Sequence, residues 1–315
     1  MKLPAFALAI SCLINLTAAH AECTDDSKKS MLSRVVAIGP TNGAIDGKPD
    51  AGEPGRAPYP LELKDKELVL TFDQGPHAKY TDYILFTLDR FCAKAVFFFS
   101  ERAALENPDT VRKVAARGHT VAVGPRLMSA DFIGISFEAA KTKIERGFAA
   151  VGSATGGQQV APFFRAPSEG LSPSLMTYLK ERGVSLWSFD IAAEDTEPGV
   201  SLGKFESRTI AQVRKAGKGV IQFHDWSKLT VDALDDILSD AKQSGFKIVQ
   251  PVAGTAFVPN REYLNGMARA TPRTHTEPRG SRSLNDAPRQ KVGVHGKEGP
   301  EAHPSSWHKW QPDKI

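Results

Sequence analysis

The stretch Glu67–Pro76, which reads ELVLTFDQGP, decides the fold of this chain. Its first six residues, Glu67–Phe72, form a short apolar run of the kind that makes a buried strand, and an Asp, a Gly and a Pro follow closely. The next segment, Tyr80–Phe91, has its apolar residues at helical spacing. A buried strand, a loop and an amphipathic helix together make the repeating unit of parallel α/β proteins.

The same alternation continues over residues 65–253. Helical spacing recurs near 108–117, 136–151, 173–182, 206–216 and 230–243, and short apolar strand candidates lie at 95–99, 120–123, 163–164, 185–189, 219–223 and 246–249. The pattern predicts a parallel sheet covered by helices. It fits a barrel and a doubly wound sheet equally well, so the pattern alone leaves both open.

The composition is that of a globular protein. The chain has 315 residues, of which 41% are hydrophobic and 24% charged, and this excludes a fully disordered or collagen-like chain. The formal net charge is +4, and residues 256–315 carry all of the excess, with 10 Lys and Arg against 6 Asp and Glu. The remaining residues are neutral as a group, so we predict no nucleic-acid partner.

Two segments outside the α/β pattern have a different character. Residues 22–64 form an N-terminal lead-in, because Gly and Pro are frequent between Gly39 and Pro60. Residues 258–315 are rich in Pro, Ser, Thr, Arg and His without apolar periodicity, which predicts a disordered basic tail.

Residues 1–21 resemble a secretory signal peptide. Lys2 supplies a positive start, Ala5–Ile14 an apolar stretch, and Ala19-His20-Ala21 a small-residue cleavage site. A retained N-terminal anchor is the alternative, but its apolar core is short for a membrane span. We therefore expect a periplasmic or secreted protein with no stable membrane span after cleavage.

Export determines how the cysteines are interpreted. Cys12 leaves with the signal peptide, so Cys23 and Cys92 remain in the mature chain. An even number of cysteines in an oxidising compartment predicts a Cys23–Cys92 disulfide, and two buried free thiols are the alternative.

Polar residues gather where the predicted strands end. Asp73, Arg165 and His224 each follow a strand candidate directly, and Asp195 follows another within a few residues. In parallel α/β proteins the active groups lie at these carboxyl ends, so the four side chains are candidates for one site.

Five motifs in the right order resemble those of the polysaccharide deacetylases, the NodB homology domain. Thr71–Pro76 (TFDQGP) resembles the family signature Thr-Phe-Asp-Asp-Gly-Pro, and the resemblance covers about residues 65–253. The other four are Gly118–Thr120, Phe164–Pro167, Trp187–Asp190 with Asp195, and Gln222–Asp225. The resemblance implies an α/β fold of the distorted (β/α)7 barrel type. It also implies metal-dependent removal of acetyl groups from N-acetyl or O-acetyl sugars of chitin, peptidoglycan or related polymers, so a saccharide is the expected partner.

The resemblance also assigns roles to the four polar residues. Asp73 matches the family's base and Arg165 the arginine that positions it, while His224 matches the acid and Asp195 the aspartate that orients the acid. In the family a divalent metal, commonly zinc, polarises the amide carbonyl and lowers the pKa of the attacking water. A carboxylate then takes the proton of that water and a histidine protonates the leaving amine.

The metal ligands of the family are missing. Their positions are occupied by Gln74, Gly124 and Met128, which offer one neutral carbonyl oxygen, no donor atom and a thioether. Outside the signal peptide and the tail the remaining histidines are His77, His119 and His224. We therefore expect no bound metal or other cofactor. Thr196 also replaces a tryptophan of the fourth motif.

Two functions fit these residues. The first is an exported protein of the deacetylase fold that is catalytically weak or inactive, a pseudoenzyme that acts by binding saccharides. The second is a working hydrolase of carbon–nitrogen bonds in acetylated saccharides, with an atypical or metal-free site. The sequence specifies neither the polymer nor the oligomeric state.

Overall fold

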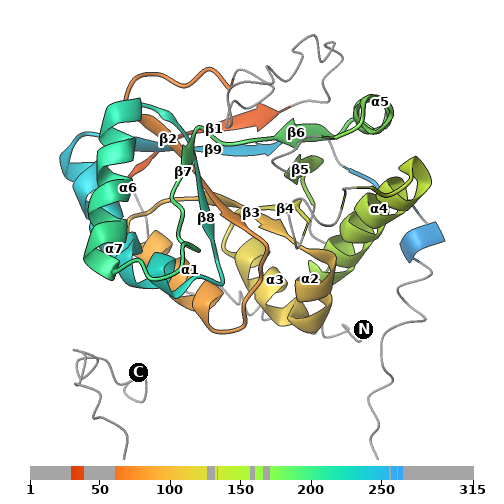
Figure 1. Ribbon diagram of the computed structural model, residues 1–315, viewed down its shortest axis with the longest axis horizontal. Helices are drawn as coiled ribbons and strands as arrows, with labels where there is room; N and C mark the ends of the chain where they lie inside the picture. Colours follow the sequence, from red (N-terminus) through yellow and green to blue (C-terminus); the bar gives the residue numbers. More distant parts are fainter. Residues whose placement is uncertain are drawn as a thin grey trace, which may run out of the picture. The chain divides into compact units, whose positions relative to one another are not determined.

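Helices and strands alternate along the chain as the sequence predicts (Figure 1). The computed structural model describes residues 30–38, 61–125, 132, 134–156, 160–165, 171–254, 257–260 and 262–264, which all belong to a unit spanning residues 1–271. The strands are β1 (Leu32–Ile38), β2 (Glu67–Asp73), β3 (Ala95–Phe99), β4 (Thr120–Val123), β5 (Phe163–Arg165), β6 (Ser185–Trp187), β7 (Ile191–Ala192), β8 (Gly219–His224) and β9 (Lys247–Ala253). The helices are α1 (Tyr80–Arg90), α2 (Glu101–Glu106), α3 (Pro108–Ala116), α4 (Phe137–Ala154), α5 (Pro173–Glu181), α6 (Leu202–Ala216) and α7 (Lys228–Gln243).

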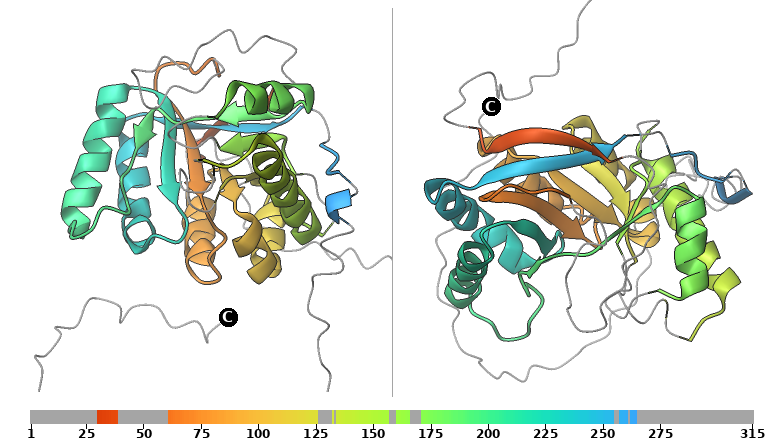
Figure 2. Two further views of the ribbon diagram at one scale, coloured as in Figure 1. Left: turned by 45° about the vertical axis from the view of Figure 1, so that its right-hand side comes forward. Right: turned by 90° about the horizontal axis from the view of Figure 1, so that it is seen from above.

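The paired strands are all parallel. Pairing runs in the order β7-β8-β2-β3-β4-β5-β6, while β9 pairs with the start of β2 and with β1. The helices lie outside the strands (Figures 1 and 2). The predicted parallel α/β fold is therefore confirmed. Among the described strands no pairing joins β6 to β7, so hydrogen bonds do not close the ring of strands.

The strand β2 is buried on both of its faces, which explains its unbroken apolar run. Phe72 stacks on Phe97 and Phe223 of the neighbouring strands, with ring centroids 5.0 and 5.6 Å away. Val69 points to the opposite face and belongs to a second, smaller apolar cluster. With packing on both faces, β2 is held in a fixed place, and so is the residue at its end.

Parallel pairing aligns the carboxyl ends of the central strands. Asp73, the last residue of β2, is the register partner of Phe98 in β3 and of His224 in β8. The register alone therefore places Asp73 beside His224.

The N-terminal lead-in contains a strand that the sequence analysis does not predict. β1 pairs along its length with β9, and Figure 2 shows the two strands side by side. Arg34 of β1 also forms an ion pair with the buried Glu67, with its Nη2 atom 2.7 Å from Oε2. Met31 is fully buried, so the chain before β1 is anchored in the core.

Several predictions fall on residues outside the described ranges. They concern the signal peptide at 1–21, the segment 39–60, Met128, Cys23 and nearly all of the tail at 258–315. Cys92 is disulfide-bonded, and its pairing with Cys23 stays a prediction because Cys23 is one of these residues. Within the described ranges no helix is long and apolar enough to cross a membrane.

Candidate active site

The four polar residues predicted for the site lie together. Asp73, Arg165 and His224 end β2, β5 and β8, and Asp195 follows β7. Asp73 contacts Arg165 directly, and His224 contacts Asp195. The site is therefore an ion pair and a hydrogen-bonded His–Asp pair at the carboxyl edge of the sheet, which is where parallel α/β proteins carry their chemistry.

The carboxylate of Asp73 is enclosed by donors. The Nε atom of Arg165 lies 3.2 Å from Oδ1 and 3.1 Å from Oδ2. The side-chain amide of Gln222 donates to Oδ2 over 2.6 Å. Only 1% of Asp73 is exposed. Both oxygen atoms of the predicted base are thus engaged within the protein.

Arg165 is buried as deeply as its partner. Its Nη2 atom donates to the Thr71 hydroxyl over 2.6 Å, and its Nη1 atom donates to the carbonyl of Ser188. The guanidinium also lies over the ring of Phe98, 4.3 Å from the centroid. Burial lowers the pKa of Arg165 while the charge of Asp73 opposes this shift. A guanidinium remains protonated even so, and its contacts fix the position of Asp73.

The imidazole of His224 is held by Asp195. The Nδ1 atom lies 2.7 Å from Oδ1 of Asp195, and the backbone N–H of His224 donates to Oδ2 over 2.7 Å. The hydroxyl of Thr230 also donates to Oδ2, which keeps the carboxylate in place. Burial opposes the charged imidazole, but the hydrogen bond that the imidazole donates to Asp195 and the nearby carboxylates outweigh it and raise the pKa of His224. The geometry is that of a histidine oriented to hold a proton at Nε2.

Trp226 is a residue of the site that sequence reasoning missed. Its ring centroid lies 5.4 Å from that of His224, and its indole N–H donates to Oε1 of Gln74 over 3.3 Å. Trp226 is 41% exposed. A single tryptophan in a loop after β8 has no periodic pattern, and its position two residues after His224 was the available signal.

The described residues do not fit the family's metal. The carbonyl oxygen of Gln74 already accepts the indole hydrogen of Trp226, and Gly124 has no donor atom. A Cβ atom added at Gly124 would lie 3.2 Å from the Cβ of Phe98 and 3.3 Å from that of Arg165, so a larger residue there would be crowded. No group of three His, Cys, Asp or Glu side chains within the described ranges is placed to bind a metal ion. Met128, the third ligand position, lies outside those ranges.

Two other histidines have structural roles. The Nδ1 atom of His77 accepts the backbone N–H groups of Lys79 and Tyr80 at the start of α1. His119 is buried, and its Nδ1 atom accepts the N–H of Ala95. Neither imidazole is directed at Asp73 or His224 by these contacts.

Asp225 is a buried carboxyl group directly behind the site. It is fully buried, its Oδ2 atom accepts the Thr81 hydroxyl over 2.9 Å, and its Oδ1 atom has no partner among the described residues. Burial raises the pKa of Asp225 to about 7. The group packs so tightly against Gly75 that any Cβ there would lie 1.9 Å from its oxygens. This contact requires glycine in the Gly-Pro turn after β2.

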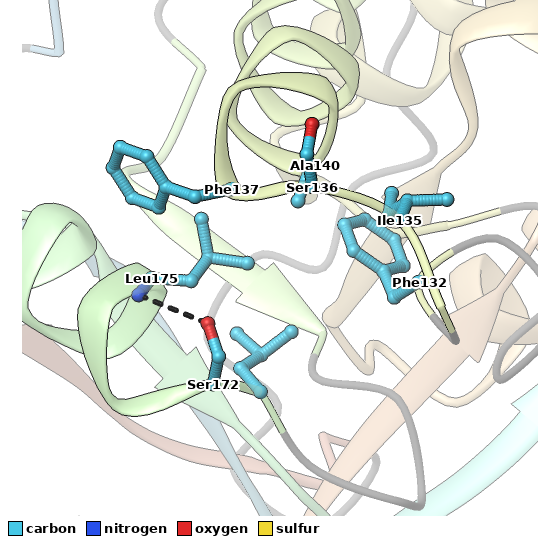
Figure 3. A pocket seen from close by; sticks show the side chains of 8 residues that line it. Phe132, Ile135, Ser136, Phe137, Ala140, Ser172 and Leu175 are labelled. Carbon is cyan, nitrogen blue, oxygen red and sulfur yellow. Dashed lines mark hydrogen bonds between the residues drawn. The ribbon is translucent and has the colours of Figure 1, made fainter.

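A separate pocket lies where α4 and α5 begin (Figure 3). Ser136 and Ser172 cap the two helices, and each side chain accepts a backbone N–H of the first helical turn. The remaining lining is apolar, with Phe132 and Leu175 facing into it. None of the lining side chains is titratable, so the pocket offers no acid–base chemistry.

Comparison with known proteins shows similarity to the polysaccharide deacetylases. The family model described as polysaccharide deacetylase matches residues 61–187. A peptidoglycan-N-acetylglucosamine deacetylase of Bacillus cereus is 30% identical over 205 residues, which cover 61% of this chain and 71% of that relative. A second such deacetylase of the same species is 28% identical over 203 residues, covering 62% of this chain and 91% of the relative.

Solved structures agree with the sequence relatives. A peptidoglycan deacetylase of Bdellovibrio bacteriovorus superimposes with a TM-score of 0.62 at 27% identity, covering 73% of this chain and 61% of that protein. This chain thus matches less than two thirds of the Bdellovibrio protein. On the fold, the motif residues at the strand ends and these relatives, the chain belongs to the polysaccharide deacetylase family.

Proposed function

We propose that this protein is an exported member of the family that recognises amino-sugar polymers of the peptidoglycan or chitin class and is catalytically impaired. The curated relatives named above are peptidoglycan deacetylases, which supports a saccharide partner. Residues 1–21 support export to the periplasm or beyond. The neutral charge of the chain before residue 256 argues against a nucleic-acid partner.

The proposal of impaired catalysis rests on the hydrogen bond that the side chain of Gln74 accepts from Trp226. A catalytic zinc site needs about three protein donors and an open position for water. At the first of the family's ligand positions, the carbonyl of Gln74 is hydrogen-bonded to Trp226 instead. At the second, Gly124 offers no donor and its surroundings leave little room for one. Two of the family's three ligand positions therefore do not offer a metal ion the donors that it needs.

The surroundings of Asp73 also support impaired catalysis. A general base must reach the proton that it removes, directly or through one water. Gln222 donates to Oδ2 of Asp73 over 2.6 Å, and the Nε atom of Arg165 lies 3.1 Å from the same oxygen. Asp73 is also only 1% exposed, so a water molecule has little access to its carboxylate.

One observation favours the second candidate function, a hydrolase with an atypical or metal-free site. The pair of His224 and Asp195 keeps its 2.7 Å contact, and the carboxylates around it raise the pKa of His224. A proton donor for a leaving amine is therefore in place, although the means of activating water is not.

Metal content and turnover of the purified mature protein separate the two functions. Retention on insoluble peptidoglycan or chitin, with no stoichiometric zinc and no acetate release, is the result expected for the impaired binder. Stoichiometric zinc with acetate release that a chelator abolishes would overturn it. Acetate release without metal that is lost in His224→Ala would establish the second candidate instead.

A further inference from the structure

We propose that Arg208 of the helix α6 is a positioning residue for the pair of His224 and Asp195. It holds the loop 193–197, which carries Asp195, in the conformation that places this carboxylate against the imidazole. The inference concerns the His224–Asp195 pair alone and goes beyond the proposed recognition of saccharides, so it can be tested without a ligand.

The loop 193–197 needs contacts from outside to keep its conformation. It follows β7, a strand of two residues that pairs with β8. Glu194 adopts a φ of 56°, which is unfavourable for a residue other than glycine because its Cβ atom crowds the following carbonyl. The position of Asp195, the next residue, therefore depends on the contacts that hold Glu194 in this conformation.

Arg208 contacts this loop at several points. Its Nη2 atom donates to the carbonyl oxygens of Ala193 and Glu194, over 3.2 and 3.1 Å. Its Nη1 atom lies 3.2 Å from the carboxylate of Glu194 and donates to that of Glu197. A guanidinium is a rigid planar fork, so these contacts fix the residues before and after Asp195 relative to one another.

Arg208 extends from a helix that is anchored in the core. Phe205, three residues earlier, and Thr209, the next residue, are both fully buried. The side chain of Arg208 is itself 22% exposed, so it lies largely against the protein. The helix α6 thus gives the guanidinium a fixed origin from which it holds the loop.

The helix α7 also holds Asp195. The hydroxyl of Ser227 donates to the backbone carbonyl of Asp195 over 2.8 Å, and the hydroxyl of Thr230 donates to its Oδ2 atom. These contacts act on Asp195 itself, whereas Arg208 acts on the residues around it. Together the two helices keep the carboxylate at 2.7 Å from Nδ1 of His224.

The conformation of the loop affects how strongly His224 holds a proton. Burial lowers the pKa of His224, whereas the hydrogen bond to Asp195 and the charges of Asp195, Asp73 and Asp225 raise it. A displaced loop would weaken the contribution of Asp195, so the pKa would fall. The positive charge of Arg208 acts in the opposite sense, because removing a cation favours the protonated imidazole. The sign of the change in pKa therefore separates positioning from a direct charge effect.

Titration of His224 by NMR on the full mature chain tests the inference, and the signal of His224 is the one that His224→Ala removes. Arg208→Lys keeps the charge but loses the planar fork, and we expect it to lower the pKa of His224 by about 0.5 pH units or more. Arg208→Met keeps the aliphatic stem alone and should lower the pKa less, since the loss of the cation offsets part of the change. Arg214→Lys is the matched control, because Arg214 lies on the same helix and pairs with Asp240 of α7 instead of the loop.

Melting curves show which variants are folded, and Arg208→Lys decides the outcome because it removes neither the charge nor the stem. A lowered pKa of His224 in Arg208→Lys, with an unchanged pKa in Arg214→Lys, supports positioning by Arg208. An unchanged or raised pKa in Arg208→Lys overturns it, even where the melting temperature falls, because Arg208 then stabilises the fold without acting on His224. No saccharide or metal enters the measurement, so either result leaves the proposed function to its own test.

Discussion

Replacing Glu67 by Gln tests whether β1 is an integral part of the domain. Glu67 accepts from Nε of Arg34 over 3.0 Å, from Nη2 over 2.7 Å and from the backbone of Lys64 over 2.8 Å. The hydrogen bonds from Arg34 dominate and lower the pKa of Glu67 from 4.5 to about 2. At about 1.4 kcal/mol per pKa unit, the charged form contributes about 3 kcal/mol of stability at neutral pH.

The sign of the pH dependence follows from the lowered pKa. The stabilisation is complete above the unfolded value of about 4.5 and is lost as the pH falls toward about 2. Gln resembles the protonated form, so the variant should melt about 6 to 12 °C below the wild type at pH 7. Between pH 4.5 and 3 the difference should shrink by about 1.4 kcal/mol per pH unit.

Thermal and urea unfolding of both proteins across this pH range measures the effect. Glu106→Gln is the control, because its ion pair with Arg102 is exposed on both sides and should change stability by less than about 1 kcal/mol. A difference between wild type and Glu67→Gln that is the same at pH 7 and pH 3 would refute the assignment of the stabilisation to the charge of Glu67.

Three further predictions concern the site. Burial raises the pKa of Asp225 to about 7, so the protein should lose stability as the pH rises from about 4 to 7. Melting curves of Asp225→Asn should show a weaker dependence on pH. An equally steep dependence in the variant would contradict the prediction. Gln222→Leu removes a donor from the buried Asp73 carboxylate and should lower the free energy of unfolding by about 2 kcal/mol in urea, and no change would argue against that contact. Gly124→Ala places a Cβ atom 3.2 Å from the Cβ of Phe98 and should lower the free energy of unfolding by about 1 to 3 kcal/mol. Gly203→Ala is the control, because a Cβ there has no atom within 4 Å and should leave stability unchanged or raise it. Equal effects of the two substitutions on the free energy of unfolding would disprove the crowding at Gly124.

The central strands could be predicted from the sequence because their signal is local. The apolar runs at 67–72, 95–99 and 120–123 correspond to β2, β3 and β4. The strand β1 lacks such a signal. Its residues alternate between intermediate burial and exposure, as in a strand at the edge of a sheet. Its pairing partner is β9, which comes from the other end of the domain in sequence. Pairing between distant segments leaves no trace in a short window of sequence.

Part of the candidate site could likewise be predicted from the sequence, and part could not. Asp73, Arg165 and His224 could be predicted because parallel strands bring their carboxyl ends to one edge. The contact of Trp226 with Gln74 could not, because it joins two loops whose conformations no periodicity describes. The hydrogen bond from Gln222 to Asp73 could not be predicted either, because the sequence does not show in which direction the amide of a glutamine in an apolar strand points.

The position of β9 has a consequence for the order of folding. β9 pairs with β1 on one side and with the first residues of β2 on the other, although it is the last strand of the domain in the chain. During synthesis from the N-terminus, β1 therefore has no pairing partner until the residues of β9 have been made. Partners so far apart in sequence make a slow, late step, because the intervening chain must be closed into a loop first. A chain that stops before residue 247 would leave the edge of β1 without its neighbour, so a nascent chain of that length would be a substrate for chaperones and proteases.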